Sequence, residues 1–312
     1  MAIAGAAFFL LSGGVWYQAV DSARMAMRHA NRVLHYQLGY QLPGTPDLAR
    51  LDERLQAQGF KRGDPVFIRV FKAEMTLELW MKRNDGFALF ASYPVCYWSG
   101  RLGPKLQTGD HQAPEGFYTV SKGQLNPNSR WHRSFDLGFP NLFDRGHGRS
   151  GSYLMVHGGC SSVGCYAMTN GVISEMWALL TAALDGGQER FAVHVFPFRP
   201  TEARLRAYQG HQWAAFWRDL KPGYDLFEAS RVPPEVSVCR GKYAVRPGQA
   251  GSRAAPALRT DCPPAETQGQ SQSGIVLGGI ALRQTPMSSP RRRGSSKTSE
   301  SLQNTGSPPS RG

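Results

Sequence analysis

A series of short apolar segments, each bounded by glycine, proline or asparagine, is the feature of this sequence that most limits its fold. Seven of them are expected to be strands, at residues 65–71, 75–81, 86–93, 116–120, 134–137, 152–156 and 190–196. In the second segment apolar side chains occupy alternate positions, which is the period of a β-strand. Short strands with this punctuation pack into sandwiches or barrels. The sequence therefore predicts a mainly β core with flanking helices, in the α+β class.

Three stretches have helical periodicity. In residues 46–59, Thr45 is expected to cap a helix that has Pro46 at its first position and ends at Gly59. In residues 173–184 apolar side chains recur at helical spacing, and two glycines follow. Residues 201–220 carry three large aromatic side chains, which we expect in the core rather than at a ligand site.

The two ends of the chain differ in composition from its middle. Residues 1–20 contain no charged side chain, which fits a secretory signal peptide, a membrane anchor or a buried helix, and their terminal position favours export. Residues 21–64 are expected to form a helical lead-in. From Arg246 onward glycine, proline, serine, glutamine and arginine dominate, with nine Lys or Arg against three Asp or Glu. This composition predicts a disordered basic tail over residues 246–312.

The formal net charge of +13 admits nucleic acid, an anionic membrane or an anionic polymer as a partner. Nucleic acid is disfavoured, because the sequence contains no zinc-finger, homeodomain or RNA-binding motif. It also contains no glycine-rich phosphate loop and no strong metal-ligand spacing, so we expect neither a metal nor another cofactor. The five cysteines are an odd number, and in an oxidising compartment one thiol would remain unpaired.

One segment combines residues that suit nucleophilic catalysis. His157 precedes Cys165 by eight positions, and three glycines lie between them. A nearby imidazole is a common means of activating a cysteine thiol. We expect residues 152–156 to be a buried strand that ends at His157, and the glycines to return Cys165 toward it. The backbone N–H groups of Gly164 and Cys165 would then be free to stabilise an oxyanion. The pattern predicts a thiol acyl-transfer site.

This segment resembles the active site of the YkuD-type L,D-transpeptidases, cysteine enzymes of bacterial peptidoglycan, and most closely their YafK-like branch. The likeness extends from about Pro65 to about Glu228. It includes the block at 97–120 with its Gly-Asp and Pro-Glu-Gly-Phe elements, and the segments 135–141 and 144–151 that lead to the histidine. The resemblance implies an L,D-transpeptidase-like β-sandwich catalytic domain over residues 65–230.

Carried over residue by residue, the resemblance makes Cys165 the nucleophile and His157 the general base. Ser162 and Gly164 would hold the Ser-x-Gly-Cys turn. The better-known branch of the family has a second histidine in this turn and an arginine two positions after the cysteine. Here Val163 and Ala167 occupy those positions, which leaves open how the donor stem peptide is bound.

Other residues have two interpretations each. His147, Arg149 and Gly158 are candidates for substrate binding, and a structural role is the alternative for His147 and Arg149. Asp110 and Glu115 lie in a loop rich in glycine and proline, where a turn or capping role is favoured over acid–base chemistry.

Two further cysteines, Cys96 and Cys160, are expected to be structural. The alternative for Cys160 is a pair or a metal site with Cys165.

These observations predict a peptidoglycan-modifying cysteine acyltransferase that acts on stem peptides through a Cys thioester. Two alternatives stay open. One is a hydrolase that trims stems or releases a stem-linked, cell-wall-linked lipoprotein, and the other is an inactive cell-wall binding module. The expected location is periplasmic or elsewhere in the cell envelope, with or without inner-membrane anchoring through the N-terminus.

Overall fold

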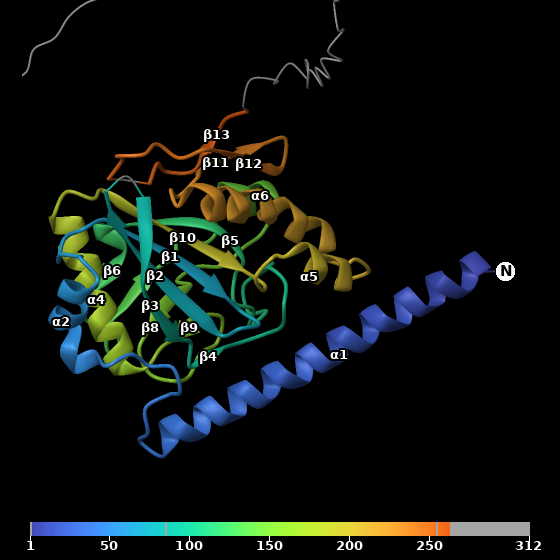
Figure 1. The fold of residues 1–312 in the computed structure, drawn as a ribbon, viewed down its shortest axis with the longest axis horizontal. Helices are drawn as coiled ribbons and strands as arrows, with labels where there is room; N and C mark the ends of the chain where they lie inside the picture. The colour runs from blue at the N-terminus through green and yellow to red at the C-terminus, as the bar shows by residue number, and fades with distance from the viewer. Residues whose placement is uncertain (1, 85, 254, 263–312) are drawn as a thin grey trace, which may run out of the picture. The chain divides into compact units, whose positions relative to one another are not determined.

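The computed structural model describes residues 2–84, 86–253 and 255–262, which belong to one compact unit. Its centre is a five-stranded sheet (Figure 1). The strands, in spatial order, are β3 (Gly86–Pro94), β2 (Thr76–Arg83), β1 (Val66–Phe71), β10 (Arg190–Phe196) and β5 (Gly116–Ser121). Only the pair of β1 and β10 is parallel among these neighbours. The structure thus confirms the strands predicted between residues 65 and 120 and at 190–196.

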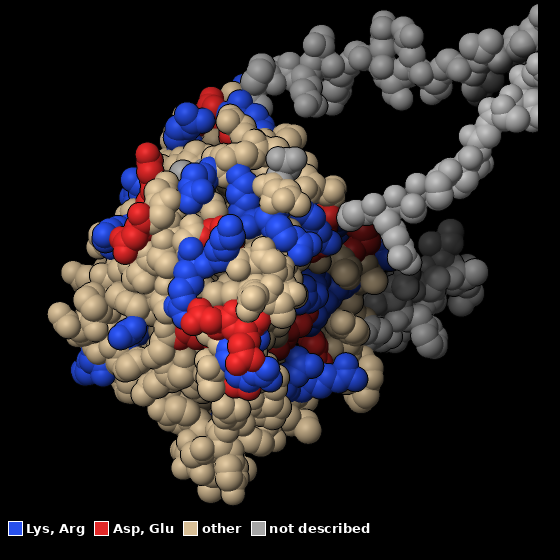
Figure 2. Space-filling view, turned by 60° about the vertical axis from the view of Figure 1, so that its left-hand side comes forward, with Lys and Arg blue, Asp and Glu red and all other residues tan. Residues whose placement is uncertain are grey.

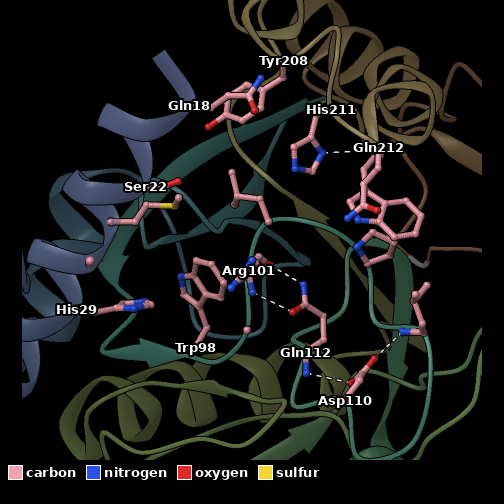
Figure 3. A pocket seen from close by; sticks show the side chains of 17 residues that line it. Gln18, Ser22, His29, Trp98, Arg101, Asp110, Gln112, Tyr208, His211 and Gln212 are labelled. Atoms are coloured by element: carbon pink, nitrogen blue, oxygen red, sulfur yellow. Dashed lines mark hydrogen bonds between the residues drawn. The ribbon is translucent and has the colours of Figure 1, made fainter. Parts of the chain in front are cut away.

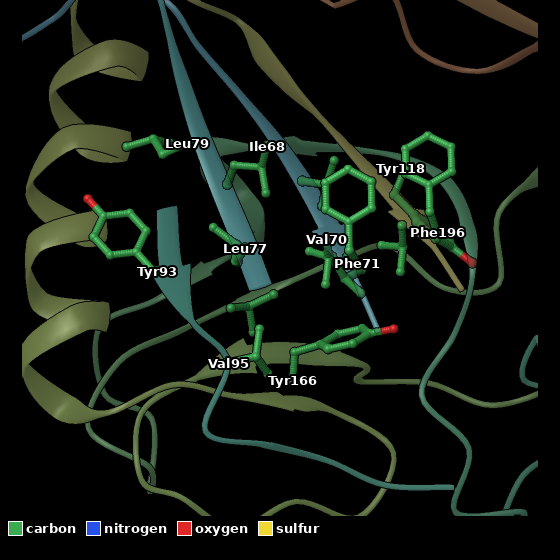
Figure 4. Packing of buried hydrophobic residues seen from close by; sticks show 14 of the residues in the cluster. Ile68, Val70, Phe71, Leu77, Leu79, Tyr93, Val95, Tyr118, Tyr166 and Phe196 are labelled. Atoms are coloured by element: carbon green, nitrogen blue, oxygen red, sulfur yellow. The ribbon is translucent and has the colours of Figure 1, made fainter. Parts of the chain in front are cut away.

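A second five-stranded sheet carries the predicted catalytic residues. Its order is β4 (Tyr97–Trp98), β9 (Tyr166–Ala167), β8 (Met155–His157), β7 (Ser134–Asp136) and β6 (Leu125–Asn126). The two sheets share one hydrophobic core. Figure 4 shows Tyr166 of this sheet facing Val70, Phe71 and Leu77 of the first. The mainly β core and the α+β class are confirmed.

Helices cover both faces of the first sheet. The longer helices among the described residues are α1 (Ala2–Gln37), α4 (Asn170–Asp185) and α6 (Ala214–Ser230). The short helices are η1 (Leu48–Arg50), α2 (Leu51–Ala57), η2 (Lys122–Gln124), α3 (Leu142–Gly146) and α5 (Glu202–Ala207). On one face Phe227 of α6 packs on Phe67 and Trp80, at 4.7 and 4.9 Å between ring centroids. The other face joins the core shared with α4. Because both faces are covered, all of β1 is buried despite its arginine at position 69.

Three predicted element boundaries were wrong. The helix predicted to start at Pro46 begins instead at Leu48, because the side chain of Asp47 accepts the Ala49 N–H and caps the helix. The strand predicted at 152–156 is displaced to Met155–His157, and Tyr153 before it has a left-handed φ of 56°. The stretch 201–220 is two helices, of which the second continues to Ser230.

Among the aromatic residues of that stretch, Trp217 is fully buried, as expected. Trp213 and Phe216 are partly buried against the core.

The termini also differ from the sequence-based segments. Helix α1 crosses the predicted boundary between residues 1–20 and 21–64, and no described helix is both long and apolar enough to span a bilayer.

The beginning of the predicted disordered tail is ordered. This part of the chain belongs to a small sheet with the strand order β12 (Lys242–Arg246), β11 (Glu235–Cys239) and β13 (Arg259–Thr260). A disulfide joins Cys239 to Cys262. Composition could not reveal this disulfide. The rest of the tail, residues 263–312, lies outside the described residues.

The surface around α2 and α4 has mixed charge. In Figure 2 Lys and Arg form a broken stripe across this side, with Asp and Glu beside them. Ion pairs account for part of this mixture: Arg50 with Glu53, and Arg62 with Asp52 at 2.7 Å. This side therefore carries charges of both signs.

Candidate active site

Two adjacent parallel strands position His157 and Cys165. In the register of β8 and β9, Val156 lies beside Tyr166 and His157 beside Ala167. Because side chains alternate along a strand, buried Val156 and Tyr166 share one face, and His157 and Cys165 share the other. Their Cα atoms are separated by one interstrand spacing and by two residues along the strand direction, which places them roughly 8 Å apart. Both residues line a single cavity of about 370 Å³. The structure thus brings the predicted pair together.

The His157 ring has a defined tautomer. Its Nδ1 lies 2.7 Å from the carbonyl oxygen of Gly158. A carbonyl only accepts hydrogen bonds, so Nδ1 carries the proton and Nε2 keeps its lone pair. Burial lowers the pKa of His157 below its usual value, and the Gly158 hydrogen bond opposes this shift. Trp131 stacks on the ring at 5.9 Å between centroids. His157 is therefore a neutral imidazole suited to accept a proton at Nε2.

Gly158 supports this arrangement because a side chain would not fit there. A Cβ atom would lie 2.6 Å from Oδ1 of Asn170 and 2.8 Å from the carbonyl oxygen of Trp131. Its N–H donates to that same Trp131 carbonyl at 3.0 Å. The structure gives Gly158 the role of orienting His157, and it is not one of the residues that line the cavity.

The turn before Cys165 is fixed by side-chain hydroxyl groups. Ser162 Oγ accepts the Cys165 N–H and donates to the Cys165 carbonyl, both at 2.7 Å. Gly164 has a φ of +98° and donates its N–H to Ser99 Oγ at 2.5 Å. Ser162 and Gly164 thus hold the turn, as expected. The expectation that the Gly164 and Cys165 N–H groups are free was wrong, because two serine hydroxyls already accept them.

The Cys165 thiol is neutral in this environment. Burial raises its pKa above the usual value, and the Met155 N–H, 3.3 Å from Sγ, opposes the shift. Sγ also lies 3.6 Å from the carbonyl oxygen of Tyr153. The pKa of the thiol is raised and that of His157 is lowered, so the resting pair is thiol and imidazole.

Disulfides account for the remaining cysteines in the described part of the chain. Cys96 pairs with Cys160, and Cys165 is left as the free thiol. This overturns the alternative that Cys160 pairs with Cys165. No cluster of three metal-ligating side chains occurs within residues 2–84, 86–253 and 255–262.

Two candidate substrate-binding residues lie elsewhere. Arg149 forms an ion pair with Asp144 at 2.7 Å and is buried beside Phe143 and Phe216. His147 donates from Nδ1 to the Phe143 carbonyl at 2.9 Å and stacks on the Phe143 ring. Neither lines the cavity of Cys165, so the structure favours their structural interpretation.

The two loop carboxylates are also structural. Asp110 accepts the N–H groups of Leu106 and Gln107 and pairs with Lys105, which are the bonds of a turn. Glu115 is fully buried and pairs with Lys72 at 3.0 Å. The favoured turn role of Asp110 agrees with these contacts.

Sequence reasoning missed several residues of the cavity. Ser134 is opposite His157 in the β7–β8 ladder, and its buried Oγ has no hydrogen-bond partner among the described residues. The guanidinium of Arg130 lies over the Trp131 ring at 5.6 Å. Arg130 is the one Lys or Arg among the described lining residues, which include no Asp or Glu. None of these residues belongs to a motif, and only the pairing of β7 with β8 reveals them.

Comparison with known proteins points to one family. Residues 65–195 match the YkuD family model, described as an L,D-transpeptidase catalytic domain. The chain is 49% identical over 183 residues to the Escherichia coli (strain K12) protein "Putative L,D-transpeptidase YafK", which covers 59% of this chain and 74% of that protein. The crystal structure of the helical cell shape determining protein Pgp2 from Campylobacter jejuni matches 58% of this chain and 68% of its own, with 19% identity and a TM-score of 0.35.

Proposed function

The chain belongs to the L,D-transpeptidase family, and we propose that it is a peptidoglycan-modifying cysteine acyltransferase with Cys165 as its nucleophile. The observation that carries the proposal is the shared cavity. It contains a free thiol and, from the neighbouring strand, an imidazole whose Nε2 is unprotonated. Family membership implies a peptidoglycan substrate.

The neutral pair sets the order of proton transfer. As Sγ of Cys165 bonds to the carbonyl carbon of a stem-peptide amide, Nε2 of His157 takes the thiol proton. When the tetrahedral intermediate breaks down, the C–N bond is cleaved and His157 returns the proton to the leaving amine. The product is a thioester on Cys165. An acceptor amine then gives transpeptidation, whereas water gives hydrolysis.

We propose that two hydroxyl groups of the cavity lining stabilise the oxyanion. Ser134 has a buried hydroxyl without a partner among the described residues, so it can donate without breaking an existing bond. Ser162 also lines the cavity. Rotating its O–H away from the Cys165 carbonyl would aim it at substrate while its oxygen still accepts the Cys165 N–H. These donors replace the free backbone N–H groups expected from sequence.

We assign recognition of the stem peptide to Arg130. Ala167 occupies the position of the family's arginine, is fully buried and pairs with Tyr97 of β4 and His157 of β8. The guanidinium of Arg130 is suited to bind a stem carboxylate with two hydrogen bonds. The Trp131 indole beneath it would shield the thioester on one side.

The presence of two disulfides supports an oxidising compartment and hence export to the periplasm or cell envelope.

Mass spectrometry of muropeptides tests the proposal. Purified protein is incubated with sacculi and compared with a Cys165→Ala variant and with a Thr108→Ala control, whose side chain is exposed and lies outside the cavity of Cys165. New cross-linked dimers that require Cys165 support transfer. Shortened stems, or release of a stem-linked lipoprotein without dimers, would assign the hydrolase alternative. Unchanged muropeptides together with retained sacculus binding would refute catalysis and leave the wall-binding module.

A further inference from the structure

A second and larger cavity lies apart from Cys165. It measures about 700 Å³ and is bounded by helix α1, the loop of residues 98–113 and the connection between α5 and α6. In Figure 3 Gln18, Ser22 and His29 of α1 lie along one side, and His211 and Gln212 lie near the opposite side. None of these residues lines the cavity of the thiol, so the two cavities are distinct.

The polar groups of this cavity are mostly uncharged. Burial, with a smaller effect of Arg32, lowers the pKa of His29 to about 4, and burial also lowers the pKa of His211. Both rings are therefore neutral at pH 7, like the glutamine amides at positions 18, 112 and 212. Two lining residues are charged: the carboxylate of Asp110 is already bound by the turn described above, and Arg101 is the one Lys or Arg among the described lining residues. A ligand rich in neutral hydrogen-bonding groups fits such a lining, and Arg101 could accommodate one negatively charged group on it.

One polar atom in the lining is unsatisfied. Nε2 of His29 is buried and has no hydrogen-bond partner in the described part of the chain. An unpaired buried group carries a desolvation cost that a ligand hydroxyl or amide would remove. Figure 3 shows His29 beside Trp98 at the lower edge of the cavity, so a ligand seated there could reach it.

Apolar surface alternates with these polar groups. The ring of Trp213 lies so close to Gly103 that a Cβ atom there would come within 2.5 Å of it, which fixes the indole in place. Leu102, Leu106 and Met25 also line the cavity. Sugar rings carry apolar C–H faces and a rim of hydroxyl groups, and an indole beside amides and imidazoles is complementary to both.

The loop of residues 98–113 separates this cavity from the nucleophile's turn. On one side it contributes Trp98, Arg101 and Gln112 to the large cavity, and on the other Ser99 accepts the Gly164 N–H. The buried ammonium of Lys72 fixes the loop, because it donates to the carbonyls of residues 101, 103 and 113 at 2.9–3.0 Å. A polymer bound on one side of this loop would thus be close to the thiol on the other.

We propose that this cavity binds the amino-sugar chain of the polymer whose stem peptides react at Cys165. The identity of the sugar rests on the proposed function, whereas the existence of a saccharide site rests on the lining. The protein would then engage the glycan and the peptide at separate sites, with the 98–113 loop between them.

Glycan binding can be measured without catalysis. The probe is a preparation of soluble glycan strands from which the stem peptides have been removed, titrated calorimetrically into the full chain. Ala26 lines the cavity from an exposed position on α1, and Ala26→Trp should fill it and weaken binding about tenfold or more. Gln212→Ala, also at an exposed lining position, should weaken binding by a similar factor. Ala23→Trp is the matched control, because Ala23 is exposed on the same helix but does not line the cavity.

The outcomes separate the two proposals. Binding that survives Cys165→Ala and Ala23→Trp but not Ala26→Trp or Gln212→Ala supports the saccharide site. A wild-type chain that processes stem peptides but does not bind stripped strands at millimolar concentration overturns the site and leaves the proposed function intact. Equal losses in Ala26→Trp and Ala23→Trp also overturn it. Glycan binding by a chain that converts no stem peptide would instead count against the catalytic proposal alone.

Discussion

Removing the Cys96–Cys160 disulfide should damage both stability and catalysis. This disulfide ties the residue that precedes β4 to the loop between His157 and Cys165. The two cysteines are 64 positions apart. In the chain-entropy relation a closed loop of that length stabilises the folded state by about 4 kcal/mol. Cys239 and Cys262 are 23 positions apart, and the same relation gives about 3 kcal/mol for that pair.

The two disulfides therefore form a matched comparison. Replacing both cysteines of a pair with serine avoids new free thiols, and urea denaturation gives the free energy of unfolding of each variant. We expect the Cys96/Cys160 variant to be the less stable by about 1 kcal/mol. It should also lose most of its turnover under native conditions, because the loop that carries the nucleophile is released. The Cys239/Cys262 variant should retain turnover, since its disulfide belongs to the small sheet that contains β11. Equal turnover in the two folded variants would refute this role of the loop.

Three further predictions concern charge and hydrogen bonding. Because burial raises the pKa of Cys165, the rate of its labelling by iodoacetamide should still increase with pH above pH 9. Because burial lowers the pKa of His157, kcat/KM should rise with pH through a midpoint below 6.5. A labelling rate that is constant from pH 5 to 8 would instead reveal a thiolate–imidazolium pair. Ser134→Ala should lower kcat about 100-fold with little change in KM, whereas a change in KM alone would exclude an oxyanion role. Lys72→Met leaves Glu115 buried without its ion-pair partner and should cost about 3–5 kcal/mol in denaturant unfolding; a loss below about 1 kcal/mol would show that the hydrogen bonds from Gly103 and Trp217 satisfy the carboxylate without Lys72.

The spacing of apolar residues predicted those helices and strands whose pattern is complete within one segment of the sequence. Strands β1, β2 and β10 follow from their own apolar residues, and α4 follows from helical spacing that ends at glycine. Residues 21–64 were expected to be helical, but a single helix that continues across residue 20 was not, because over residues 14–37 most side chains are exposed and the apolar pattern is weak. Helix α1 contributes Met25 to the core, and Arg28 donates to the carbonyl of Ala73 at 2.8 Å. Such contacts depend on a partner far away in the sequence.

The candidate site shows the same division. His157, Cys165 and the Ser162 turn lie within nine residues of sequence, so a motif can reveal them. Ser99, which follows β4, and Ser134 of β7 reach the same place from 66 and 31 positions before Cys165. Ser99 lies in the block at 97–120 that resembles the family, but nothing in that block indicates a contact with Gly164, and Ser134 belongs to none of the resembling segments. Their roles follow from the order of strands in the second sheet, which sequence periodicity does not determine.

The neutrality of the resting pair has a consequence for specificity. A preformed thiolate would react with many electrophiles, whereas a neutral thiol must lose its proton during attack. Nε2 of His157 and Sγ of Cys165 come from different strands, so a substrate carbonyl seated between them is needed to couple the two steps. Because Arg130 and Trp131 border the same cavity, a stem carboxylate bound by Arg130 would place that carbonyl. Activation of the nucleophile would then depend on recognition of the stem, and the thiol would stay unreactive in its absence.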